Sequence, residues 1–99
     1  MEHHVYFWLG EDHQNADDRA AFETGLDSLT KLNGVKRGLW SVPAKVAPRP
    51  VVDRSWDYAL STSFEDVAAH DAYQIDPVHQ VFIDSFKPWW SKVLVMDLA

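Results

Sequence analysis

Residues 70–79, His-Asp-Ala-Tyr-Gln-Ile-Asp-Pro-Val-His, carry the signals that end one helix and begin another. Asp76 has the side chain of an N-cap, and Pro77 suits the first helical position, where an amide hydrogen would lack a partner anyway. Apolar residues follow a helical period on both sides, at Phe64, Val67, Ala68, Ala72 and Ile75 and then at Val78, Val81, Phe82 and Phe86. The stretch therefore predicts two short helices that meet at a rigid corner.

Tyr73 and His79 flank this corner and are the candidate catalytic residues. The dipole at a helix N-terminus disfavours an imidazolium, so His79 should be a neutral base near pH 7. A buried phenol such as Tyr73 can donate a hydrogen bond to an oxygen on which negative charge develops. The alternative is structural, with His79 bonded to a backbone group or to Asp76 and Tyr73 holding the loop. Both interpretations stay open at this point.

Outward from the corner, the N-terminal half predicts a strand and a longer helix. Residues 4–9, His-Val-Tyr-Phe-Trp-Leu, alternate between two largely apolar faces, so both faces of this strand need cover. Asn15 is the expected N-cap of a helix that runs to about Leu32. Its buried stripe consists of Phe22, Leu26 and Leu29. Gly25 lies on the same side, and we expect it to let the helix approach the sheet closely.

Three more strands are predicted at residues 35–42, 51–62 and 92–98, and prolines make 43–50 a loop. The order β-α-β-β-α-β, with a broken second helix, predicts an α+β protein with a ferredoxin-like, four-stranded antiparallel sheet. Strict alternation places one ring-rich set on the face without helices: His4, Tyr6, Trp8, Trp56, Tyr58 and Leu60. We expect two such faces to pack together in a homodimer, a dimeric α+β barrel that encloses a pocket.

Composition narrows the functional class. The 99 residues suffice for one domain, 1–99, and the absence of cysteine excludes disulfides and thiolate metal sites. The net charge of −6 without a basic stripe argues against nucleic acid and anionic membranes as partners. No signal peptide or membrane span is visible, so we expect a cytoplasmic protein. Because no two histidines have helical i, i+4 spacing, we expect no metal and no cofactor, with His3, His13 and His70 exposed.

Three stretches resemble the stress-responsive A/B barrel (Dabb) family: residues 4–9, residues 51–58 (Val-Val-Asp-Arg-Ser-Trp-Asp-Tyr) and residues 73–79. The likeness covers nearly the whole chain and implies a single Dabb domain that forms a homodimeric barrel. Many members have no assigned activity. A plant polyketide-cyclase branch closes a linear polyketide by aldol condensation without metal or cofactor.

The resemblance to the cyclase branch extends to its site residues. There a tyrosine and a histidine that match Tyr73 and His79 carry the chemistry, and a histidine that matches His4 lines the cavity. This chain departs from that branch at Asp76 and Tyr58, which stand where the cyclases have histidine.

Two hypotheses of different class follow. In the first, the chain is a homodimeric barrel of unassigned biochemical role, with a small hydrophobic-ligand pocket between the sheets and an architectural corner. In the second, it is a cofactor-free, polyketide-cyclase-like or monooxygenase-like enzyme for a small hydrophobic or aromatic molecule, with His79 as base and Tyr73 as donor. The expected ligand-binding residues are His4, Tyr6, Trp8, Tyr58, Leu60 and Trp90. An open pocket would favour the enzyme, and a filled interior would favour the architectural role.

Overall fold

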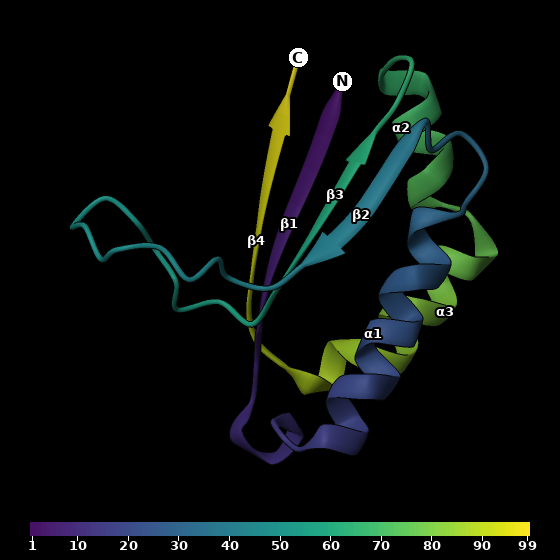
Figure 1. The fold of residues 1–99 in the computed structure, drawn as a ribbon. Helices are drawn as coiled ribbons and strands as arrows, with labels where there is room; N and C mark the ends of the chain where they lie inside the picture. Colours follow the sequence, from purple (N-terminus) through teal and green to yellow (C-terminus); the bar gives the residue numbers. More distant parts are fainter.

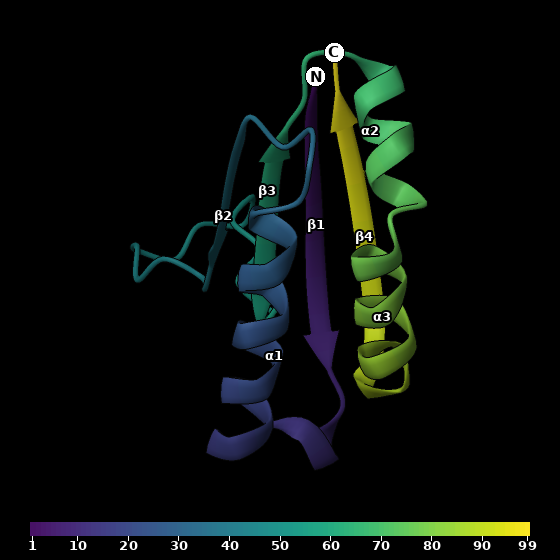
Figure 2. The same ribbon diagram turned by 90° about the vertical axis from the view of Figure 1, so that its right-hand side faces the viewer.

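In the computed structural model, which describes all of residues 1–99, a four-stranded antiparallel sheet carries its helices on one face (Figures 1 and 2). The strands are β1 (Glu2–Leu9), β2 (Arg37–Ser41), β3 (Tyr58–Ser63) and β4 (Trp90–Leu98), in the spatial order β2-β3-β1-β4. The helices are α1 (Ala16–Thr30), α2 (Val67–Gln74) and α3 (Pro77–Phe86), with short 3-10 helices η1 (Glu11–His13) and η2 (Lys87–Trp89). The expected ferredoxin-like fold is confirmed. None of the helices is long and apolar enough to span a membrane.

Local capping sets where α1 and α3 begin. The Asn15 side chain accepts a hydrogen bond from the amide of Asp18 at 2.9 Å, as expected for the N-cap of α1. Asp76 accepts from the amide of Val78 at 2.8 Å, and Pro77 opens α3. These interactions join residues two or three apart, so the sequence alone predicts them.

The core lies between the sheet and the helices, and aromatic rings dominate it. Val5, Phe7 and Leu9 of β1 are buried on the helix side of the sheet. From α1, the predicted stripe of Phe22, Leu26 and Leu29 packs against them, and Phe82 of α3 joins the same cluster. The ring of Phe22 lies within 6 Å of those of both Phe7 and Phe82, in the edge-on and tilted geometries that aromatic pairs prefer.

Two expectations about helix packing are wrong. Gly25 faces α3 rather than the sheet, since a Cβ there would lie 2.5 Å from the Phe86 ring and 3.1 Å from the Phe82 ring. On α2 the buried side chain is Tyr73, whereas Val67 at the start of the helix and Ile75 just after its end are exposed. The helix turns its aromatic face inward because the ring of Tyr73 removes more apolar surface from water than the aliphatic side chains would.

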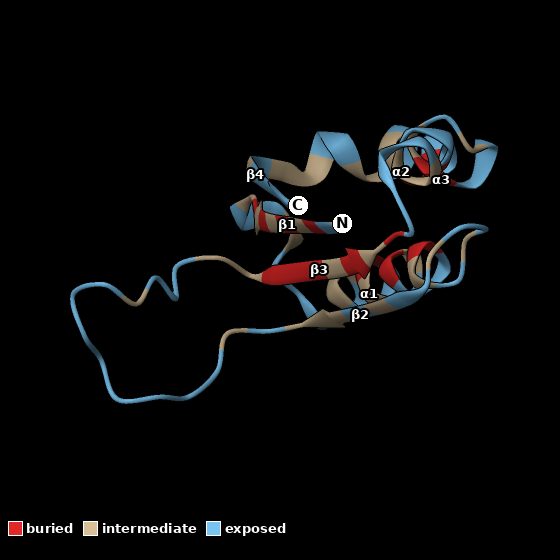
Figure 3. Cartoon of the chain, turned by 90° about the horizontal axis from the view of Figure 1, so that it is seen from above, coloured by how far each residue is buried: buried red, intermediate tan, exposed pale blue.

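The third strand is shorter than expected and its register differs. It begins at Tyr58, and residues 51–57 belong to a long loop that projects away from the helices (Figures 1 and 3). A bend at Asp57 breaks the alternation that the sequence pattern assumed. Because Val5 pairs with Leu60 and Phe7 with Tyr58, these two β3 residues face the helices. The expectation that they share a face with Tyr6 and Trp8 is therefore wrong.

The opposite face of the sheet has no helix against it (Figure 1). Tyr6 and Trp8 of β1 lie on this outer face, and so do Leu94 and Met96 of β4, both exposed. Trp56 from the long loop packs edge-on against Tyr6, with ring centroids 5.4 Å apart. The outer face is therefore apolar and open in the single chain.

Candidate active site

A cavity of about 370 Å³ lies between the sheet and the helices α2 and α3. Its walls are mainly apolar and include Val5, Phe7, Leu60, Phe82, Ile83 and Trp90. Six polar side chains of β1, α2, α3 and β4 also reach it: His3, His70, Tyr73, Gln74, His79 and Asp97. An apolar cavity with a few polar groups that converge on it is the usual form of a small-molecule site.

Tyr73 and His79 meet in this cavity from different helices. Their ring centroids are 4.8 Å apart with the rings edge to face, and only 1% of Tyr73 and 9% of His79 are exposed. The Tyr73 hydroxyl and Nδ1 of His79 are buried without any hydrogen-bond partner. Because buried polar groups are nearly always satisfied, these two atoms are available to a bound molecule.

Burial shifts the pKa of each group in the direction that favours its neutral form. It raises the pKa of the Tyr73 phenol well above its ordinary value of 10, so this phenol stays a hydrogen-bond donor. Burial is also the main reason that the pKa of His79 lies below 6.5, and the neighbouring His3 adds to the effect. The neutral imidazole of His79 is therefore favoured near neutral pH, and burial is the main cause of this preference.

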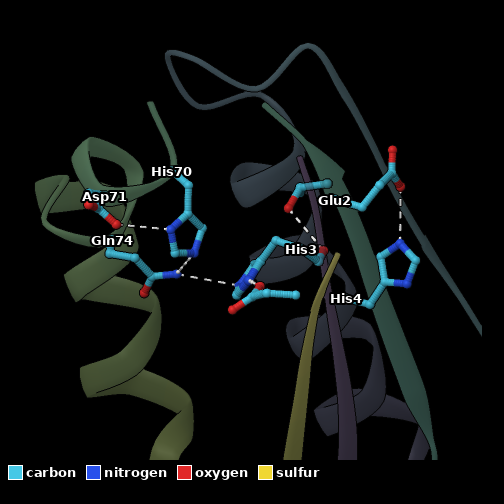
Figure 4. Close-up of polar contacts among 8 residues, drawn as sticks. Glu2, His3, His4, His70, Asp71 and Gln74 are labelled. Carbon is cyan, nitrogen blue, oxygen red and sulfur yellow. Dashed lines mark hydrogen bonds and ion pairs between the residues drawn. The ribbon is translucent and has the colours of Figure 1, made fainter. Parts of the chain in front are cut away.

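His3, expected to be exposed, is the β1 histidine that faces the cavity. Only 5% of it is exposed, and its Nδ1 lies 2.5 Å from a carboxylate oxygen of Asp97 on β4. Burial lowers the pKa of His3, and the nearby Asp97 opposes that shift without overcoming it. Because alternate side chains point to opposite faces, His4 lies on the outer face, where it contacts Glu2 at 3.1 Å (Figure 4).

His70 was also expected to be solvated, and it too borders the cavity. Its ring lies 4.8 Å from that of His3, and the Gln74 side chain lies between the two imidazoles (Figure 4). Sequence reasoning missed this neighbourhood because 67 residues separate His3 from His70. The available signal was the spacing of His70, Tyr73 and Gln74, which places all three on one face of α2.

The six expected ligand-binding residues do not form one site. Leu60 and Trp90 line the cavity with Tyr73 and His79, but His4, Tyr6 and Trp8 lie on the outer face. Tyr58 is a buried core residue whose hydroxyl donates to Glu23 at 2.5 Å. Burial and this carboxylate raise the pKa of Tyr58 to about 12. The polar face of the site comes instead from His3, Asp97 and α2.

The outer face carries two smaller hollows. One, of about 330 Å³, is bounded by the rings of Tyr6, Trp8 and Trp56 together with Leu94 and Met96. The Trp8 indole donates to Ser55 at 3.0 Å, which ties the long loop to this face. The other, of about 210 Å³, is mostly polar and includes His4 and Arg37. Neither hollow contains an unpartnered buried polar atom, in contrast to the cavity on the helix side.

A family profile described as Stress Responsive A/B Barrel Domain matches residues 1–99. Among curated proteins, no sequence matches. Among solved structures, a Dabb family protein with a ferredoxin-like fold from Mesorhizobium loti is 23% identical with a TM-score of 0.77, over 99% of this chain and 93% of that one. A dimeric ferredoxin-like protein of unknown function from Jannaschia sp. CCS1 is 26% identical with a TM-score of 0.74, over 99% and 96%. A hydroxynitrile lyase from Passiflora edulis is 19% identical with a TM-score of 0.76, over 96% and 87%.

Proposed function

The chain belongs to the stress-responsive A/B barrel family, and on that premise we propose that it is a cofactor-free acid–base enzyme for a small hydrophobic or aromatic carbonyl compound. One observation carries the proposal: the Tyr73 hydroxyl and His79 Nδ1, together with the indole nitrogen of Trp90, are buried without partners at an apolar cavity of about 370 Å³. Leaving such atoms unpaired is unfavourable by about 1–3 kcal/mol each, so the arrangement favours a ligand that satisfies them.

The cavity suits a molecule of modest size with one polar end. Its apolar walls would exclude water from the reacting atoms and strengthen each hydrogen bond made there. No lysine or arginine lines it, so a strongly anionic substrate has no counter-charge. A ring or short alkyl chain would lie against Phe82 and Trp90, with its carbonyl directed to Tyr73.

The proposed chemistry is a proton transfer next to a carbonyl group. The neutral imidazole of His79 takes a proton from the carbon adjacent to the carbonyl, and the electron pair of that C–H bond moves onto the oxygen. The Tyr73 hydroxyl donates a hydrogen bond to the enolate oxygen. In an aldol-type closure the enolate carbon then bonds to a second carbonyl carbon, and the imidazolium returns its proton to the new alkoxide. The structure from Passiflora edulis supports this proposal only in that a protein of the same fold is described as a hydroxynitrile lyase.

We further propose that the chain forms a two-fold homodimer through the outer face of the sheet. This face exposes Leu94 and Met96 beside the rings of Tyr6 and Trp8, an apolar surface that a soluble monomer rarely leaves open. The structure from Jannaschia sp. CCS1 is described as dimeric. In such a dimer the catalytic cavity would lie within each subunit, on the helix side, rather than between the two sheets.

The test is turnover of a panel of small polyketide-like and aromatic carbonyl compounds by the wild type, Tyr73→Phe and His79→Gln. We expect each substitution to lower the rate by about 10²–10⁴-fold. His13→Gln is the matched control, because this histidine stacks on Trp89 outside the cavity. Turnover that survives both changes would discard the assigned roles. Binding of panel compounds in the cavity without turnover would leave a ligand-binding protein.

A further inference from the structure

His3 and His70 each have one ring nitrogen occupied by a carboxylate. Nδ1 of His3 contacts Asp97 at 2.5 Å, and Nδ1 of His70 contacts Asp71 at 3.1 Å. A carboxylate can only accept a hydrogen bond, so Nδ1 of each ring carries the proton. Nε2 of each ring is therefore left as the acceptor. A histidine whose other nitrogen donates to a carboxylate is the usual arrangement of a metal ligand in proteins.

The two free nitrogens converge on one point. Nε2 of His3 lies 3.4 Å from the amide nitrogen of Gln74, and Nε2 of His70 lies 3.2 Å from the same atom (Figure 4). The ring centroids are 4.8 Å apart, and ligand atoms of His3, His70 and Asp97 all lie within 4.8 Å of one another. Three side chains that can act as metal ligands, from β1, α2 and β4, thus meet at one end of the cavity.

We propose that this cluster binds a divalent transition-metal ion, with Nε2 of His3 and Nε2 of His70 as its two nitrogen ligands. The Gln74 side chain rotates to present its amide oxygen as a third ligand. The ion takes the place of the Gln74 amide nitrogen that now contacts both rings. Because Zn²⁺ bonds to imidazole nitrogen at about 2.0–2.1 Å, the two rings must move closer together to bind it. Asp97 and Asp71 then act behind the ligands, where they orient the rings and offset the positive charge.

The chemistry of the donors selects the class of metal. Imidazole nitrogen suits Zn²⁺ and its neighbours among the transition metals, whereas Mg²⁺ and Ca²⁺ prefer oxygen ligands. The competing structural interpretation is that Gln74 merely bridges the two rings, and both of its contacts are longer than the usual 2.9–3.0 Å. The site lies at the mouth of the cavity, since the Asp97 side chain is half-exposed. An ion can therefore enter from solvent, and its binding does not depend on the proposed reaction.

The experiment is isothermal titration of the tag-free protein with ZnCl₂ alone, in the absence of any substrate. We expect one ion per chain in the wild type and an affinity at least about tenfold weaker in His3→Gln and in His70→Gln, since each change removes a ligand. His4→Gln is the matched control, because this neighbouring histidine points to the opposite face of the sheet. Substitution by Co²⁺ should give the visible absorption of a nitrogen-ligated site in the wild type and lose it in His70→Gln.

Several results would overturn the proposal. Absence of binding by the wild type, or equal binding by His70→Gln, would leave the cluster as a hydrogen-bonded structural feature. Loss of binding in His3→Gln but not in His70→Gln would place the ion at the amino terminus of the chain. If His3→Gln fails to fold, as judged by its thermal melt, His70→Gln carries the test, because His70 lies at the periphery of the core.

Asp97→Asn should weaken binding by about 10–100-fold if the carboxylate orients His3.

Discussion

The rings of Tyr73 and His79 meet edge to face with their centroids 4.8 Å apart, although the two residues belong to different helices. The corner between α2 and α3 holds them in this relation. Asp76 caps α3 through the amide of Val78, and its own amide donates to the carbonyl of Tyr73 at 3.2 Å. The same residue thus ends one helix, begins the next and fixes the angle at which the two rings approach.

Replacing Asp76 by Ala should therefore destabilise the protein by about 0.5–2 kcal/mol, because the first turn of α3 loses its cap. Urea unfolding followed by circular dichroism measures this change. Asp76→Asn keeps an oxygen at the cap and should retain most of the stability, and Asp84→Ala removes only an exposed contact with Gln80. Indistinguishable Ala and Asn variants would show that the cap contributes little.

Stability should fall as the pH is lowered from about 7.5 to 5.5. Burial lowers the pKa of His3 and His79 in the folded state, whereas in the unfolded chain both titrate near 6.5. Below that pH the unfolded chain binds protons that the folded protein does not, so stability rises with pH across this window. Urea titrations at several pH values measure the slope.

The contribution of His79 can be isolated by comparing two variants. His79→Gln removes one of the two buried histidines, so the free energy of unfolding should depend less steeply on pH than in the wild type. Tyr73→Phe changes the same cavity but should keep the slope of the wild type, because the pKa of this phenol is raised far above the range studied. If the stability of the wild type stays constant or increases toward pH 5.5, the two histidines are not held neutral by burial.

Gly38 of β2 lies where the strand crosses the end of α1. A Cβ at this position would lie 2.9 Å from the Cα and carbonyl oxygen of Thr30, which are backbone atoms that cannot rotate away. Gly38→Ala should thus destabilise the protein by about 1–3 kcal/mol through overpacking. The matched control is Gly10→Ala, where the nearest atom is 3.6 Å away and φ is −64°. That change should be neutral or stabilise slightly, so equal melting temperatures for the two variants would refute the packing argument.

Light scattering at micromolar concentration should find a dimer of the 11.3 kDa chain. Leu94→Lys and Met96→Lys place a charge on the apolar outer face and should shift the protein toward monomer, because an unpaired charge is costly to bury. Val81→Lys is the control, since this exposed side chain lies on a helix away from the outer face. A folded wild-type monomer would exclude the proposed interface.

Local sequence patterns that span two to four residues predict much of the fold. Asn15 and Asp76 predict helix starts because each satisfies an amide two or three positions away. The Phe22, Leu26 and Leu29 stripe predicts the buried side of α1. The alternation of residues 4–9 predicts a strand between two covered faces, and the order of these elements predicts the sheet.

Only the tertiary structure decided which residues make the site. Alternation places His3 and His4 on opposite faces of the sheet, with His4 on the face without helices, but it does not say which residues His3 meets. Those neighbours depend on the register of β1 against β3 and β4, which pairs Val5 with Leu60 and His3 with Asp97. A single bend at Asp57 likewise moved Tyr58 and Leu60 to the helix side. His3, His70 and Asp97 converge across separations of 27 to 94 residues, and no local pattern specifies such contacts because they exist only once the sheet has paired and α2 has packed on it.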